Sequence, residues 1–229
     1  LQANTTGGDN VAVGLNSLVS QTTGSSSVAI GKESLQNNTT GGSNVAIGKD
    51  TLKGNTTGSD NTAVGKDSLR SNTTAANNTA VGGAALQANT TGTYLTAIGQ
   101  NALVASVTGS NSTAIGFESL KGTVSTSNAY GNTAIGKSSG YNITTGYNNT
   151  MIGEGSRGVD ATSSDQVVLG SNVQSVAQAY ITLGIGTSRT YVSAGATSWS
   201  GTSDLRLKDN ITTSTAGLSF INDLRPITF

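Results

Sequence analysis

The sequence Val28-Ala29-Ile30-Gly31 decides the fold of this chain, because close variants of it recur along most of the 229 residues. The motif glycine returns at a constant spacing of seventeen positions from Gly14 to Gly116, and the steps to Gly153 and Gly170 have the same length. The step from Gly116 to Gly136 is longer, and the last step, to Gly184, is shorter. A fixed period of this kind is typical of repeat architectures. The first ten motif glycines are Gly14, Gly31, Gly48, Gly65, Gly82, Gly99, Gly116, Gly136, Gly153 and Gly170.

The residues before each glycine predict a short β-strand. An aliphatic residue precedes the glycine in every copy, and Val or Thr stands two positions before that residue in most copies. Residues two apart share one face of a strand, and β-branched side chains suit such a face. The residue between them is nearly always Ala. A small residue kept at one position indicates a crowded face, such as a contact with a neighbouring chain.

A second apolar anchor and a polar turn complete each repeat. Leu stands four positions after each of the first seven motif glycines, at Leu18, Leu35, Leu52, Leu69, Leu86, Leu103 and Leu120. The anchor is lost at Gly140 and Arg157, so the later repeats are expected to be irregular. A turn follows, commonly Asn-Thr-Thr-Gly as in Asn38 to Gly41, and these residue types favour turns.

A single repeat with two or three apolar anchors is too short to fold alone, but stacked repeats bury a continuous core. We therefore predict an all-β fold for residues 1–185, a parallel β-roll or solenoid in which each seventeen-residue repeat forms one coil. Neighbouring coils should lie ~4.8 Å apart. A helical solenoid is disfavoured because Val, Ile, Thr, Asn and Gly are weak helix formers.

The composition excludes several function classes. Apolar residues make up 34% of the chain against about 45–50% in average proteins, and charged residues 10% against about 25%. The net charge is zero, which gives no basic field for nucleic acid. The chain has no Cys and no His, which excludes the usual zinc sites and Cys or His nucleophiles. No apolar run approaches the ~20 residues of a membrane helix. We expect no cofactor, no metal site, no nucleic-acid partner and no membrane insertion.

Three repeated polar patterns have simpler interpretations than binding or modification. Asn-x-Thr triplets such as those at Asn38 and Asn55 match glycosylation acceptors, but they also recur with the turn. Adjacent threonines such as Thr39 and Thr40 differ from the alternating Thr-x-Thr pairs of ice-binding solenoids. The aspartates lack the period that a calcium-binding repeat requires.

The unit Asn44-Val45-Ala46-Ile47-Gly48, with a polar Gly turn between copies, resembles the head repeats of trimeric autotransporter adhesins, which also occur in phage tail fibres. The resemblance covers about residues 1–185. It implies a left-handed parallel β-roll with three chains packed side by side as a homotrimer. The typical adhesin repeat is shorter than the repeat of this chain, so a longer turn is expected here.

The composition changes after about Gly186, which predicts a connecting stalk at 186–202 and a separate segment at 203–229. The stretch Gly201 to Ile211 resembles the opening of the intramolecular chaperone domain of phage tailspikes and tail fibres of the endosialidase type. The last six residues, from Leu224, match the continuation of that domain. The resemblance implies a short C-terminal α/β fragment of a domain that drives trimer assembly and then cuts its own chain.

The same resemblance implies two catalytic residues for the self-cleavage. Carried over by position, Ser203 would be the nucleophile and Lys208 its base, with the cut between Ser203 and Asp204. The chemistry is possible without histidine, because burial lowers the pKa of a lysine and lets it accept a proton.

These patterns together favour a structural fibre protein of a virion, a phage tail fibre that attaches to a host. The expected partners are two further copies of the chain, a host cell-surface receptor or glycan, and other virion tail proteins. The alternatives are a cellular trimeric adhesin and a polysaccharide-degrading tailspike, although the sequence shows no evident pair of acids for the latter. The tyrosines from Tyr130 to Tyr147 either fill the core where Leu is lost or form a small receptor-contact patch.

Overall fold

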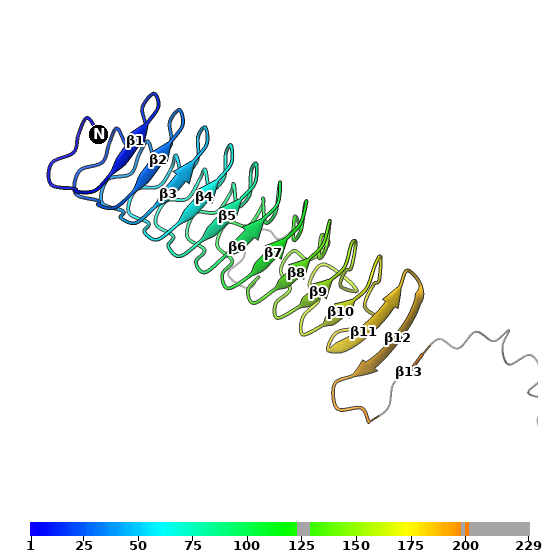
Figure 1. Ribbon diagram of the computed structural model, residues 1–229. Helices are drawn as coiled ribbons and strands as arrows, with labels where there is room; N and C mark the ends of the chain where they lie inside the picture. Colours follow the sequence, from blue (N-terminus) through cyan, green and yellow to red (C-terminus); the bar gives the residue numbers. More distant parts are fainter. Residues whose placement is uncertain (123–128, 198–199, 202–229) are drawn as a thin grey trace, which may run out of the picture.

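The computed structural model describes residues 1–122 and 129–197 and the backbone of residues 200 and 201. These residues form a rod of stacked coils, each of which contributes one short strand to a single long sheet (Figure 1). The strands of the coils are β1 (Val11–Val13), β2 (Val28–Ile30), β3 (Val45–Ile47), β4 (Thr62–Val64), β5 (Thr79–Val81), β6 (Thr96–Ile98), β7 (Thr113–Ile115), β8 (Thr133–Ile135), β9 (Thr150–Ile152), β10 (Val167–Leu169) and β11 (Tyr180–Ile185).

The strands β1 to β11 are parallel and follow one another in sequence order. Corresponding residues lie opposite each other, so that Ala46 pairs with Ala63 and Ile47 with Val64. The prediction of an all-β parallel solenoid with 17-residue coils is confirmed, and no helix occurs in the described part of the chain. The handedness of the roll and the number of chains stay predictions.

The last coil strand, β11, forms an antiparallel hairpin that extends into the segment 186–202. The strand β12 (Ser188–Ser193) turns back after Gly186 and pairs with β11, and β13 (Ser200–Gly201) pairs with β12. Gly186 has a φ of 58°, which suits the two-residue turn between these strands. The hairpin covers the edge of β11, which would otherwise present unpaired backbone groups.

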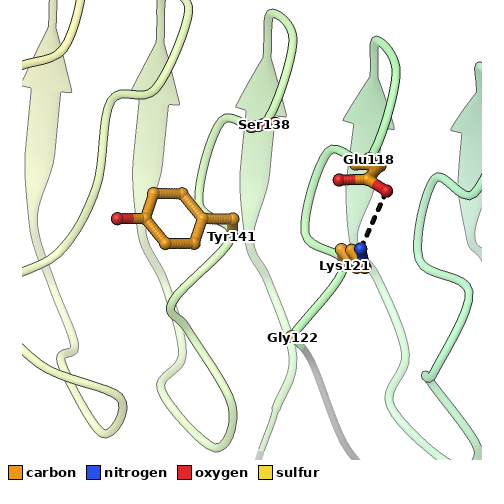
Figure 2. A pocket seen from close by; sticks show the side chains of 5 residues that line it. All are labelled: Glu118, Lys121, Gly122, Ser138 and Tyr141. Atoms are coloured by element: carbon orange, nitrogen blue, oxygen red, sulfur yellow. Dashed lines mark hydrogen bonds and ion pairs between the residues drawn. The ribbon is translucent and has the colours of Figure 1, made fainter.

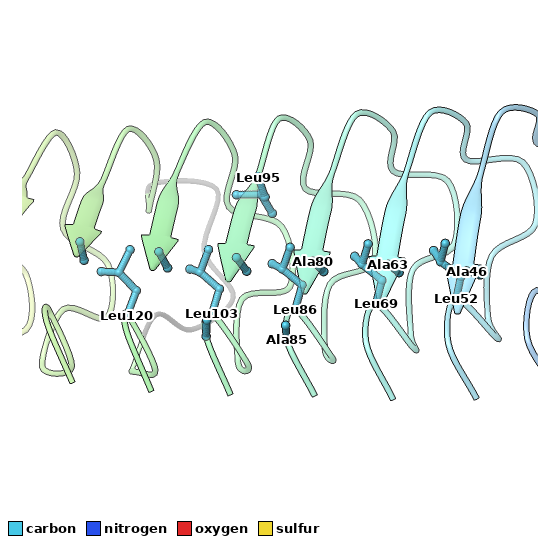
Figure 3. Close-up of a cluster of buried hydrophobic side chains, with 14 of the residues drawn as sticks. Ala46, Leu52, Ala63, Leu69, Ala80, Ala85, Leu86, Leu95, Leu103 and Leu120 are labelled. Carbon is cyan, nitrogen blue, oxygen red and sulfur yellow. The ribbon is translucent and has the colours of Figure 1, made fainter. Parts of the chain in front are cut away.

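The interior of each coil is lined by the central Ala of the strand and by the Leu anchor (Figure 3). Both are fully buried in the regular coils, as Ala63 and Leu69 illustrate. The alanines do lie on a crowded face, but the expectation that this face contacts a neighbouring chain was wrong. The crowding comes from the coil itself, because the Ala side chain points inward against the Leu anchors.

Two ladders of buried amides complete the core. In the turn ladder, Asn55 Nδ2 donates to Asn38 Oδ1 at 2.7 Å and Asn72 Nδ2 donates to Asn55 Oδ1 at 2.8 Å. In the second ladder, which precedes the strands, Asn61 Nδ2 donates to Asn44 Oδ1 at 3.1 Å. All of these side chains are fully buried. Much of the interior is therefore polar yet hydrogen-bonded, which explains a stable core at 34% apolar content.

The motif glycines form the corner after each strand with φ between 123° and 138°. A Cβ on Gly65 would lie 2.7 Å from the carbonyl carbon and oxygen of Gly82 in the next coil. Sterics therefore require glycine at this corner on two grounds. Four positions later the Leu anchors also adopt positive φ, 48° at Leu69 for example. That strain, of order 1–3 kcal/mol, is balanced by ~1.5–3 kcal/mol from burying each Leu side chain.

Candidate functional site

The strands carry an aliphatic ladder on the outside of the rod. We call it the outer stripe; it comprises the last residue of each strand from β1 to β10: Val13, Ile30, Ile47, Val64, Val81, Ile98, Ile115, Ile135, Ile152 and Leu169. Each stripe residue pairs in register with the next, so the stripe is continuous along the rod.

The outer stripe is too exposed for a core and too apolar for an ordinary surface. Ile98 and Ile152 keep 39% and 40% of their surface exposed, although Ile is among the most commonly buried residues. Isolated exposed aliphatics are normal, but a continuous apolar patch marks an interaction surface. The outer stripe is therefore a candidate interface with another protein surface.

The irregular coils are packed differently from the regular ones. Gly140 occupies the Leu position of the β8 coil, and a Cβ there would lie 2.7 Å from Leu120 Cδ2 and 3.3 Å from Met151 Sδ. Met151 replaces the central Ala of β9 and is fully buried, so its longer side chain fills the space that the missing Leu leaves. The interpretation that tyrosines fill this core was wrong. Tyr130, Tyr141 and Tyr147 are all exposed.

These three tyrosines lie in two places. The rings of Tyr130 and Tyr147, which precede neighbouring strands, stack with centroids 5.3 Å apart and an angle of 9° between their planes. Tyr141 follows the corner of the β8 coil and lines a hollow of about 480 Å³ between this coil and the preceding one. We call it the Tyr141 hollow, and its lining residues are Glu118, Lys121, Gly122, Ser138 and Tyr141.

Figure 2 shows how the Tyr141 hollow is built. Lys121 Nζ donates to Glu118 Oε1 at 2.8 Å, and this ion pair belongs to the β7 coil. Ser138 and Tyr141 belong to the next coil. The Tyr141 ring is seen face-on and its hydroxyl points away from the ion pair. The ring therefore extends along the rod, across the direction of the coils, and has a flat apolar face.

One pair of regular coils carries a charged cluster at the equivalent positions. Between the β2 and β3 coils, Lys53 Nζ donates to Glu33 Oε2 at 2.6 Å and lies 3.5 Å from Asp50 Oδ1. The hydrogen bond from Lys53 lowers the pKa of Glu33 from 4.5 to about 2. The pKa of Lys53 is raised in turn, mainly by its hydrogen bond to Glu33. Three charged side chains thus bridge the groove between two coils.

The Tyr141 hollow lies at the same three positions of the repeat. Glu33 and Glu118 each stand two positions after their motif glycine, whereas Lys53 and Tyr141 stand five positions after the glycine of the next coil. Ser138 stands two positions after its motif glycine, where the β3 coil has Asp50. A tyrosine therefore stands where the bridging lysine would be. Glu118 pairs with Lys121 of its own coil instead, so among the described residues no ion pair joins the two coils at these positions.

The residues singled out from the sequence fall in three different settings. The motif glycines form the corners, and the Leu anchors lie in the core. Ser203 and Lys208 lie outside the described residues, as does the expected C-terminal helix. The triplet asparagines Asn38 and Asn55 are fully buried and their amides are hydrogen-bonded in the turn ladder, which leaves no accessible acceptor for a glycan there.

The described part of the chain contains neither a cluster of metal-ligating side chains nor a helix that could cross a membrane. Across residues 1–122 and 129–197, no three Asp or Glu side chains gather as a metal site would require. Within the same ranges, no helix has the length and apolar character needed to cross a membrane.

The geometry defines the class of protein: a parallel β-solenoid with 17-residue coils and a continuous outer stripe. Comparisons of the chain with protein families, with characterised proteins and with solved structures give no match. Function is therefore argued from the surfaces of the solenoid.

Proposed function

We propose that this chain is part of a virion fibre, a phage tail fibre in which three copies assemble side by side to attach the particle to a host surface. The observation that supports this best is the outer stripe. It runs along successive strands from β1 to β10 in unbroken register, and in a single chain it faces solvent.

A cyclic arrangement of chains around an axis parallel to the rod would cover the outer stripe along its whole length. In such an assembly equal coils of each chain lie at the same height, so each stripe residue meets its own copies. Burying apolar area contributes about 25 cal/mol per Å². Each additional coil therefore adds about the same interface free energy. The number three comes from the resemblance to adhesin heads.

The rod also suits the mechanical part of this role. Neighbouring coils share parallel backbone pairing and both amide ladders, so bending the rod would break many hydrogen bonds at once. The zero net charge leaves little self-repulsion between chains packed side by side.

The C-terminal sequence supports a phage fibre over a cellular adhesin. The stretch Gly201 to Ile211 resembles a self-cleaving assembly chaperone, whereas cellular trimeric adhesins end in a membrane anchor. In this proposal Ser203 and Lys208 release the chaperone after the trimer has formed. Attachment would involve a receptor or glycan of the host and other tail proteins of the virion.

The oligomer is tested by native mass spectrometry. The wild-type chain should give a particle of three chains of 22.8 kDa each. Ile98→Glu should shift it to monomer, because three carboxylates would be buried at one height of the axis. Thr91→Glu is the matched control: Thr91 is exposed in the turn before the same strand, away from the stripe, and its variant should stay trimeric. A monomeric wild-type chain, or a trimer that tolerates Ile98→Glu, would contradict the proposal.

A further inference from the structure

We propose that the Tyr141 hollow binds a neutral sugar, a pyranose ring whose C–H face packs on Tyr141 and whose hydroxyls reach the Glu118–Lys121 pair and Ser138. The inference rests on the proposed attachment role and names the class of ligand for one site in it.

The first argument is the change at equivalent positions of the repeat. In the β2 and β3 coils these positions hold Glu33, Asp50 and Lys53, whose charges bridge the groove. In the β7 and β8 coils the second acid is a serine and the bridging base is Tyr141. The same positions of the repeat therefore hold an ion-paired cluster in one place and line a hollow of about 480 Å³ in another. That volume lies within the range of small-molecule sites, about 300–1,000 Å³.

The second argument is the exposure of an aromatic ring on a rod that has few aromatics. Aromatic residues are 4% of the chain. Tyr141 is 45% exposed and is not part of the buried core. An exposed tyrosine presents a rigid amphipathic face at a low entropic cost, which suits it to binding surfaces. Figure 2 shows the ring face-on beside the other residues that line the hollow.

The third argument concerns charge. Glu118 and Lys121 neutralise each other at 2.8 Å, so the hollow carries no net charge that would attract a phosphate or a sialic acid. The carboxylate can still accept hydrogen bonds and the ammonium can still donate them. Ser138 adds a hydroxyl that does both. Vicinal sugar hydroxyls, which donate and accept, complement such a set better than an anion does.

The test is saturation-transfer NMR on the whole chain with methyl β-D-galactopyranoside and methyl α-D-glucopyranoside as neutral probes and glucuronate as the anionic one. The sugars are used at about 50 mM, above the ~1 mM Kd expected when one small ring is bound. At least one neutral probe should receive saturation on its C–H protons. Tyr141→Lys should weaken binding at least tenfold, because it recreates the lysine bridge to Glu118.

Two further variants separate the ring from its surroundings. Tyr141→Phe should bind within about twofold of wild type, because the hydroxyl points away from the ion pair. Tyr94→Asn is the matched control: Tyr94 is an exposed tyrosine of another coil, and the equivalent positions of the flanking coils hold Asn77 and Asn111. This variant should bind as wild type does. Tyr141→Ala replaces Tyr141→Lys if circular dichroism shows that the lysine variant is unfolded.

Several results would overturn the proposal. They are the absence of saturation for both neutral sugars, equal binding by wild type and Tyr141→Lys, loss of binding in Tyr94→Asn, or tighter binding of glucuronate than of either neutral probe. Native mass spectrometry on the same samples distinguishes failure of the sugar site from failure of the fibre assembly. A trimer that binds no sugar contradicts only the sugar site, whereas a monomer that binds it through Tyr141 contradicts only the fibre assembly.

Discussion

The turn ladder of buried asparagines predicts how much a single amide contributes to the rod. Asn72 Nδ2 donates to Asn55 Oδ1 at 2.8 Å and to the Ala75 carbonyl at 3.0 Å, and its Oδ1 accepts from Asn89 Nδ2 at 3.0 Å. Asn72→Ala removes all three hydrogen bonds. The Ala75 carbonyl keeps the bond from Asn61 Nδ2 at 2.9 Å, but the buried Oδ1 of Asn55 loses its donor.

The magnitude follows from these losses. Leaving a buried acceptor without a donor costs ~1–3 kcal/mol, and each of the other lost hydrogen bonds contributes about 1 kcal/mol. The amide of Asn89 keeps its bond to the Gly92 carbonyl at 3.0 Å, which limits the loss on that side. We expect Asn72→Ala to lower the local free energy of unfolding by about 3 kcal/mol, which is roughly a hundredfold in the opening equilibrium.

Hydrogen exchange read by mass spectrometry measures this opening coil by coil. Amides of the coils from Asn55 to Asn89 should exchange roughly a hundredfold faster in Asn72→Ala, whereas coils beyond β8 should change little, because repeat stability is set by nearest neighbours. Thr74→Ala is the control, since Thr74 is exposed two positions away in the same turn and should shift exchange by less than threefold, about 0.5 kcal/mol. Unchanged exchange in Asn72→Ala would refute the structural role of the ladder.

Asn72→Asp adds a pH test of the same reasoning. The carboxylate would face acceptors where the amide donated, so burial and repulsion should raise its folded-state pKa above the unfolded value of about 3.9. Its destabilising effect should then be smallest below about pH 4, grow as the pH rises toward the folded-state pKa, and stay constant above it. Exchange that is equally fast at pH 4 and pH 8, after correction for the intrinsic rate, would contradict a buried ladder.

Two other predictions test the corner and the charged groove. Gly65→Ala should lower the free energy of unfolding in urea by more than about 3 kcal/mol, because its Cβ would lie 2.7 Å from the backbone of Gly82. Gly83→Ala is the control: the nearest atom to its Cβ would be 4.0 Å away, so the free energy should change by less than about 1 kcal/mol. Similar effects of both variants would refute the steric reasoning. In a carboxyl-carbon NMR titration, Glu33 should titrate at about 2 and move toward 4.5 in Lys53→Met. Because the folded-state pKa is the lower one, the stabilisation from this pair is complete above about pH 4.5 and is lost as the pH falls toward 2; a midpoint that Lys53→Met leaves unchanged would exclude Lys53 as the cause.

The positions of the strands could be predicted from the sequence because they depend on local sterics. A corner with φ near 130° requires glycine, so the glycines of the motif mark the end of each coil strand. The inward face could not be assigned in the same way. A period of two says that Ala46 and Ile47 face opposite sides, but both are apolar, and in a thin coil the smaller one lies inside. The signal was present in Asn44, which shares the face of Ala46 and belongs to the buried ladder.

The Tyr141 hollow was harder to predict than the fold because it depends on contacts between coils. Tyr141 and Lys53 stand equally far from their motif glycines in the sequence, but the hollow depends on how the β7 and β8 coils stack across the longer step before Gly136. The sequence also left open whether tyrosines fill the core. Met151 does so instead, because a strand residue next to Gly140 can extend into the space that the absent Leu would occupy.

Gly140 stands in place of the Leu anchor and Met151 in place of the central Ala. These two replacements also explain why the proposed sugar site, the Tyr141 hollow, lies beside an irregular coil. Between the β2 and β3 coils, charged side chains pair from one coil to the next, as Lys53 and Glu33 do. A distinct ligand site needs a coil in which the pairing fails while the core stays filled. The β8 coil meets both conditions, since Met151 keeps the interior packed and Tyr141 leaves the exterior open. Stability and recognition are thus carried by opposite faces of the same coil, so the outer residue can vary without loss of the stack.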